Sequence, residues 1–214
     1  MKDFDAPRER MVDLQLRARG IGDRSVLAAF KSVPRHAFLA PDFWPDAYED
    51  RPVPIGLGQT MSQPFVVAYM AELLELSGDE RVLEIGAGCG YAAAIFGRLA
   101  AEVFTVELEP ALAKRATENL RAAGAANVAV RAGDGTLGWP EKAPFDRIVA
   151  SAALEQAPAA LLEQFGPGGL FCGPMGPGPA QRMTRIRRTE RDFEHQTLAP
   201  VLFVPMRRAP TEGT

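Results

Sequence analysis

Two kinds of hydrophobic pattern alternate along the middle of the chain. Short apolar runs lie at residues 81–85, 102–106, 127–130, 145–150 and 169–172. Segments with helical spacing of apolar positions lie between or beside them, at residues 91–99, 110–123 and 158–165. Short strands that alternate with helices predict an α/β fold, with a mostly parallel sheet covered on both faces.

The two ends of the chain have different patterns. Helices are expected at residues 8–19, where Gly20 ends the pattern, at 23–32 and at 65–76. Residues 35–64 have no clean period, and a long irregular stretch in a compact domain is usually functional. Two strand-like runs near the C-terminus, at 182–188 and 198–206, have no helix between them, which predicts an antiparallel hairpin at the sheet edge.

These patterns suggest an organisation for the chain, which we expect to form one structural domain overall. Residues 1–78 would form an N-terminal helical segment with an active-site loop, and residues 79–207 would form the ligand-binding sheet. Residues 208–214 would be a polar tail.

Composition narrows the class of protein. The chain has 214 residues, 47% of them hydrophobic and 24% charged, as in soluble globular proteins. A net charge of −3 argues against tight nucleic-acid binding, and no apolar run reaches the roughly 20 residues of a membrane span. The N-terminus is charged throughout and the chain has 2 cysteines. We therefore expect a cytoplasmic monomer with no nucleic-acid or membrane partner.

The strongest local signal is the sequence VLEIGAGCGY at residues 82–91. A buried strand runs into Gly86, Gly88 and Gly90, and a helix follows at once. Glycines in this place let the backbone turn sharply and approach a ligand closely. A dinucleotide fingerprint would have its third glycine at position 91, where this chain has Tyr91. The spacing therefore favours S-adenosyl-L-methionine over NAD, although such a loop alone can be a simple tight turn.

Two carboxylates follow the next strands. Glu107 ends the second strand, where its side chain can accept hydrogen bonds from both hydroxyls of a ribose. Asp134 lies in a Gly-Asp-Gly turn after the third strand, and Gly135 beside it lets the backbone approach an adenine ring. Alternatively, Glu107 is a solvated strand end and Asp134 is a turn former or helix cap.

The irregular stretch carries a resemblance to a known family. The segments VPRHAFLAP at 33–41 and AYEDRPVPIGLGQTMSQP at 47–64 resemble protein-L-isoaspartate O-methyltransferases. So do three later segments, GDGTLGWPEKAPFDRIVASAA at 133–153, LLEQFGPGGLFCGPMG at 161–176 and PVLFVPM at 200–206. The resemblance extends from residue 33 to residue 206 in a single order.

The resemblance implies a Rossmann-like class I methyltransferase with a C-terminal antiparallel hairpin and added N-terminal helices. It implies methyl transfer to the free carboxylate of L-isoaspartyl residues in damaged proteins and peptides, which is a repair function. Ser62 and Thr60 are then the catalytic residues. The expected cofactor-binding residues are Thr60, Met61, Ser62, Glu84, Gly86, Ala87, Gly88, Gly90, Glu107, Leu108, Asp134 and Gly135.

This chemistry needs no general base, because a carboxylate with a pKa of about 4 is already ionised at neutral pH. We therefore expect Ser62 to position the acceptor. The competing interpretation is that Thr60 and Ser62 only cap the following helix. Three other functions are weighed. They are a methyltransferase of this fold acting on another carboxylate, a small molecule or RNA, a non-catalytic relative, and an NAD oxidoreductase, which Tyr91 disfavours. His36 and His195 have no metal-ligand spacing, and no metal site is expected.

Overall fold

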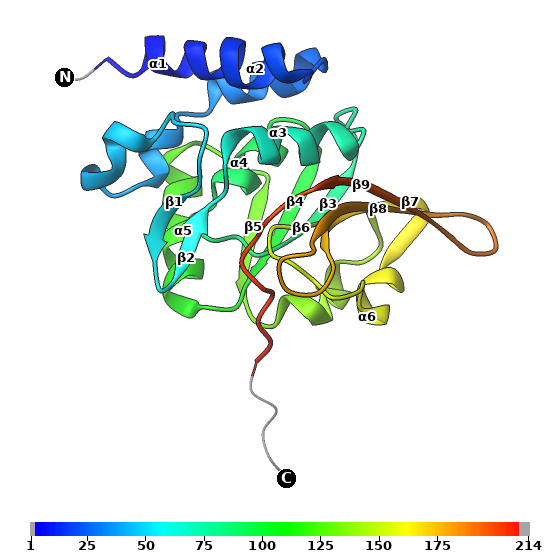
Figure 1. Ribbon diagram of the computed structural model, residues 1–214. Coiled ribbons are helices and arrows are strands. Elements are labelled where there is room, and N and C mark those ends of the chain that lie inside the picture. The colour runs from blue at the N-terminus through cyan, green and yellow to red at the C-terminus, as the bar shows by residue number, and fades with distance from the viewer. Residues whose placement is uncertain (1–2, 210–214) are drawn as a thin grey trace.

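A seven-stranded sheet forms the centre of the protein in the computed structural model, which describes residues 3–209 (Figure 1). The strand order is β5-β4-β3-β6-β7-β8-β9. The strands β5, β4, β3, β6 and β7 run parallel to one another. The pairs β7–β8 and β8–β9 are antiparallel. The strand bounds are β3 Arg81–Ile85, β4 Glu102–Glu107, β5 Val128–Ala132, β6 Phe145–Ala150, β7 Phe165–Met175, β8 Arg182–Arg188 and β9 Phe193–Pro200. The predicted parallel sheet with antiparallel C-terminal strands is therefore confirmed.

Helices cover both faces of the sheet, and α1 and α2 lie farther from it than α3 (Figure 1). The α-helices are α1 Asp5–Arg10, α2 Arg24–Ser32, α3 Pro64–Leu73, α4 Tyr91–Gly97, α5 Pro110–Ala122 and α6 Ala159–Leu162. The first helix continues as a π-helix at Met11–Leu16 and a 3-10 turn at Arg17–Arg19. It ends at Gly20, as predicted, with a positive φ of 103°. No helix within residues 3–209 has both the length and the apolar character needed to cross a membrane.

The hydrophobic core has two parts, one on each face of the sheet. Successive residues of β3 point to opposite faces, so Val82 packs with the N-terminal helices while Leu83 and Ile85 pack on the other side. Both faces are buried, which explains why the strands are almost continuously apolar. The N-terminal helices share one core cluster with the sheet.

The irregular stretch contains secondary structure that the hydrophobic pattern did not predict. Short 3-10 turns lie at Arg35–Phe38 and Pro41–Asp46. An antiparallel hairpin follows, with β1 at Val53–Gly56 and β2 at Gln59–Met61. These strands are too short for a period-two pattern to stand out, and Pro54 interrupts the first. The Gln-Thr-Met-Ser sequence at 59–62, which includes β2, lies beside the carboxyl ends of the strands of the large sheet.

The predicted last strand, at residues 198–206, was wrong in its bounds. The strand that pairs with β8 is β9, which ends at Pro200, and a tight turn closed by Thr189 and Asp192 precedes it. An edge strand faces solvent, and β9 is correspondingly polar and mostly exposed. The apolar run at 201–206 leaves the sheet and crosses its end instead. Likewise, the helix expected at 158–165 is only the one-turn α6, because β7 already begins at Phe165.

Candidate active site

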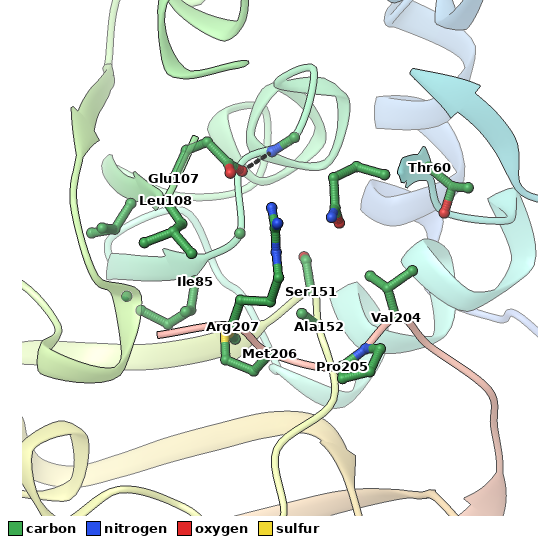
Figure 2. Close-up of a pocket in the computed structure, with 15 residues that line it drawn as sticks. Thr60, Ile85, Glu107, Leu108, Ser151, Ala152, Val204, Pro205, Met206 and Arg207 are labelled. Carbon is green, nitrogen blue, oxygen red and sulfur yellow. Dashed lines mark hydrogen bonds between the residues drawn. The ribbon is translucent and has the colours of Figure 1, made fainter. Parts of the chain in front are cut away.

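A cavity lies at the carboxyl ends of β3, β4 and β6 (Figure 2). The chain passes from β3 outward to β4 and β5, and later returns to the other side of β3 as β6. Ligands of open α/β sheets bind at such a change of direction. The cavity is lined by Gln59, Thr60, Ile85, Gly86, Gly88, Val106, Glu107, Leu108, Gly135, Ser151, Ala152, Val204, Pro205, Met206 and Arg207.

The glycine loop turns from β3 into α4. Gly86, Gly88 and Gly90 have φ angles of 93°, 55° and 89°, which other residues rarely adopt. At Gly90 a Cβ atom would also lie 3.2 Å from the carbonyl oxygen of Ala116. The three glycines are therefore required by the turn itself, and Gly86 and Gly88 bring bare backbone to the cavity wall.

Glu107 holds this loop. Its Oε2 accepts a hydrogen bond from the backbone N–H of Gly88 at 2.7 Å (Figure 2). Its Oε1 accepts from the N–H of Glu109 at 3.0 Å. The side chain is buried and lines the cavity. A carboxylate has about four lone-pair sites, so two remain for a ligand. Because Glu107 is buried and hydrogen-bonded to two backbone N–H groups, the alternative of a solvated strand end does not describe it.

Glu84 lies behind the cavity and does not line it. Its side chain is completely buried and accepts hydrogen bonds from the hydroxyls of Thr105, at 2.7 Å, and Ser151, at 3.1 Å. Burial raises the pKa of Glu84 to about 7, against the effect of the two hydroxyls and with a further contribution from Glu107. Ser151 does line the cavity, so Glu84 reaches a ligand only through this serine.

The raised pKa of Glu84 predicts a pH-dependent stability. The folded chain keeps this proton up to about pH 7, whereas a carboxyl with the ordinary pKa of 4.5 releases it earlier. Glu84 therefore lowers the free energy of unfolding progressively between those two values. We expect Glu84→Gln, which is neutral throughout, to gain up to ~3 kcal/mol over wild type between pH 5 and pH 8.

Urea unfolding at the two pH values measures this difference. The exposed Glu190→Gln is the matched control and should show no such trend. A constant difference between Glu84→Gln and wild type at both pH values would contradict the shifted pKa.

Asp134 is a cap rather than a cavity residue. Its Oδ1 accepts from the N–H and hydroxyl of Thr136, at 2.8 and 2.7 Å, and its Oδ2 accepts from the N–H of Ala209. Burial raises the pKa of Asp134, but the bonds from Thr136 outweigh it, so the pKa is lowered. Its neighbour Gly135 does line the cavity, and a Cβ there would lie 2.3 Å from the Ile85 side chain. The Asp134 side chain therefore caps the turn that follows it, which is the second of the two roles expected for this residue.

Thr60 and Ser62 lie at two different cavities. Thr60 lines the first cavity from β2, whereas Ser62 lines a second cavity of about 460 Å³. Thr60, Ser151, Val204 and Pro205 line both, so the two cavities adjoin. The capping alternative fails, because no side chain caps the N-terminus of α3.

The remaining expected residues line a third small cavity or the first one. Met61 and Ala87 line a small cavity of about 30 Å³ together with Thr60, Ser62 and Gly88. Leu108 and Ile85 give the first cavity an apolar side. The structure thus brings the expected residues to these cavities at the carboxyl ends of the strands, except for Gly90 and the side chains of Glu84 and Asp134, which line none of them.

Several cavity residues were not among the expected site residues. Ser151 directly follows β6, so the rule that drew attention to Glu107 would also have found it. Val204 and Pro205 belong to the displaced apolar run. Arg207 extends into the middle of the cavity in Figure 2, and its guanidinium pairs with Glu109 at 2.6 Å. Within the expected tail at 208–214, the N–H of Ala209 donates to Asp134, and residues 210–214 lie outside the described residues.

The donor set fits an adenosyl sulfonium compound. Glu107 offers free lone pairs for ribose hydroxyls, the apolar side formed by Ile85 and Leu108 suits a flat base, and the bare glycine backbone allows close approach. Arg207 is one of the side chains that line this cavity, and its guanidinium is held by the ion pair with Glu109. Among residues 3–209, no three potential metal ligands come together.

The fold and the cavity define the class of protein: a class I methyltransferase that uses S-adenosyl-L-methionine. The family model for protein-L-isoaspartate(D-aspartate) O-methyltransferase matches residues 7–210, and the chain belongs to that family. Protein-L-isoaspartate O-methyltransferase 2 of Anaeromyxobacter sp. strain Fw109-5 is 53% identical over 206 residues, covering 95% of this chain and 84% of that protein. A relative of the same activity name from Methanoculleus marisnigri is 49% identical over 199 residues, covering 93% and 90%.

Solved structures agree on the fold. A protein-L-isoaspartate O-methyltransferase superposes with a TM-score of 0.85 at 28% identity, covering 92% of this chain and 65% of that one. A Plasmodium falciparum structure, described as in complex with S-adenosyl-L-homocysteine, gives a TM-score of 0.81 at 21% identity and covers 94% of this chain and 99% of its own. The first of these chains is therefore longer than the present one.

Proposed function

We propose that the protein transfers a methyl group from S-adenosyl-L-methionine to the free carboxylate of L-isoaspartyl residues in damaged proteins and peptides. Membership of the family supports this reaction. The observation that carries the assignment of the site is that the two cavities adjoin at Thr60 and Ser151. One cavity suits the donor, and Ser62 lies in the other.

Bound S-adenosyl-L-methionine supplies an electrophilic methyl group on a positively charged sulfur. The acceptor carboxylate is already ionised at neutral pH, so the protein has no proton to remove. In this proposal Ser62 donates a hydrogen bond that orients the acceptor, and Thr60 stands between the acceptor and the donor. Correct alignment of this kind can contribute roughly 7–11 kcal/mol to a reaction between two bound groups.

The walls of the second cavity suit a peptide. Pro52 and Val66 lie on one side, and the extended segment Leu202–Pro205 forms the other. An isoaspartyl residue runs the backbone through its side chain, which displaces the free carboxylate relative to that of ordinary aspartate. We propose that the extended segment grips the peptide through main-chain groups, as an added strand would. The protein then acts as a single chain in the cytoplasm, with peptides and proteins as its partners.

Methyl transfer to paired peptides tests this function. We expect labelled methyl to appear in a peptide that contains one L-isoaspartyl residue, and to be at least about 100-fold slower to appear in its aspartyl twin, because misalignment removes most of the gain from positioning. Equal labelling of both peptides, or of neither, would contradict the proposed substrate.

A further inference from the structure

Arg35 is the largest completely buried side chain in the described part of the protein. It lies in the irregular stretch, in the 3-10 turn Arg35–Phe38. Its Nε donates to the carbonyl oxygen of Ala47 at 2.8 Å, and its Nη2 donates to the carbonyl oxygen of Ser62 at 2.7 Å. The guanidinium carbon lies 4.8 Å from the centre of the Tyr91 ring. The Arg35 side chain thus contacts both Ser62, which is proposed to orient the acceptor, and Tyr91, the first residue of α4.

The positive charge of Arg35 has no acidic partner within residues 3–209. Both of its bonded acceptors are neutral carbonyls, and its Nη1 is buried without a hydrogen-bond partner among those residues. The polar groups around it are Tyr91, Cys89 and Tyr48, and burial raises the pKa of each of these three, so all are neutral at pH 7. Burial lowers the pKa of Arg35 itself, but a guanidinium stays charged in proteins.

An unpaired buried charge is costly, and proteins rarely keep one without a use. Here the charge lies directly behind the place where a negatively charged acceptor is proposed to bind. The carbonyl and hydroxyl of Ser62 belong to one residue, so the guanidinium is within roughly 7 Å of that hydroxyl. An acceptor carboxylate beside Ser62 would provide the missing negative charge, whereas a neutral group in the same place would not.

We propose that Arg35 is a positioning residue with two effects: it fixes the backbone at Ser62, and its buried charge favours an anionic acceptor over a neutral one. This inference rests on the proposed role of Ser62 in binding the acceptor. It assigns part of the substrate selectivity to a side chain that lines none of the cavities described above.

The test compares two ligands rather than two rates. One is an isoaspartyl peptide, and the other is the same peptide with its free carboxylate replaced by a carboxamide. Calorimetry on protein saturated with S-adenosyl-L-homocysteine gives the Kd of each. We expect wild type to prefer the carboxylate, and Arg35→Met to lower that preference at least about tenfold. Arg35→Lys should keep most of the preference at low pH, where the buried lysine is protonated, and should lose it as the pH rises, because burial lowers the pKa of a lysine. Its turnover should fall because the two carbonyl contacts change.

A purely structural role gives a different pattern. Loss of packing alone would weaken both peptides equally, so an unchanged preference in Arg35→Met would overturn the proposal. If the Met variant fails to bind S-adenosyl-L-homocysteine and is therefore misfolded, the Lys variant decides the matter, because a preference that is absent at every pH between about 5 and 8 contradicts the proposal. The exposed Arg24→Met on α2 is the matched control and should leave both Kd values unchanged.

Ser62→Ala separates this inference from the function on which it rests. If Ser62→Ala leaves peptide binding and turnover intact, the proposed site for the acceptor is wrong. If Ser62→Ala impairs turnover while Arg35→Met keeps the preference for the carboxylate, only the inference about Arg35 fails.

Discussion

Replacement of Glu107 by alanine is expected to raise the Kd of S-adenosyl-L-homocysteine at least about 100-fold, since hydrogen bonds to a charged group contribute ~1.5–3 kcal/mol each. Two effects combine in this variant. The ribose hydroxyls lose their acceptor, and the N–H of Gly88 loses the bond that holds the glycine loop against β4. Glu107→Gln keeps one carbonyl oxygen and the size of the side chain, so it should lose only about tenfold.

Isothermal calorimetry measures both variants, with Glu118→Ala as the matched control. Glu118 is an exposed glutamate on α5, and its removal should leave the Kd unchanged. Unfolding curves establish that the Glu107 variants are folded under the conditions of the titration. A Glu107→Ala protein that is folded and binds S-adenosyl-L-homocysteine like wild type would place the donor elsewhere.

Ser62→Ala should have the opposite signature. We expect kcat/KM for an isoaspartyl peptide to fall about 30- to 100-fold, because the lost hydrogen bond to a carboxylate contributes ~2–3 kcal/mol. The Kd of S-adenosyl-L-homocysteine should change less than about threefold, since Ser62 lines the second cavity and not the first.

Steady-state methylation and calorimetry on the same preparation separate the two effects. Ser62→Thr keeps a hydroxyl and should recover part of the activity, while the exposed Ser25→Ala should behave like wild type. Equal loss of turnover and of donor affinity in Ser62→Ala would contradict the division of roles between Ser62 and Glu107.

The sequence predicted those site residues whose positions follow from the geometry of neighbouring strand ends. The carboxyl ends of parallel strands meet at one edge, so a glycine loop after one strand and an acid after the next were expected to face the same ligand. Gly88 and Glu107 do so, and they are hydrogen-bonded to each other. The same reasoning would have led to Ser151.

Long-range packing explains most of what the sequence did not reveal. The first part of β9, residues 193–197, was missed because these side chains are mostly polar and exposed, as on an edge strand. The run from Val201 to Met206 was mistaken for a strand, although it is apolar because it packs on the core and lines the cavities. No local pattern could show that Arg207 reaches across to Glu109.

Side-chain direction and burial were the other gaps. Adjacent residues of a strand point to opposite faces, so Ile85 faces the cavity while Glu84 turns away from it toward Thr105 and Ser151. Arginines are mostly exposed, and nothing near Arg35 in the sequence indicated that this one is completely buried under Ser62.

The central claim is that a donor held at Glu107 and the glycine loop meets an acceptor carboxylate oriented by Ser62. A crystal structure of the protein with S-adenosyl-L-homocysteine and an isoaspartyl peptide tests it most directly. The account predicts ribose hydroxyls on the Glu107 carboxylate, and the peptide carboxylate beside the Ser62 hydroxyl, facing the sulfur atom past Thr60. A nucleoside bound away from Glu107, or a peptide carboxylate bound away from Ser62, would contradict it.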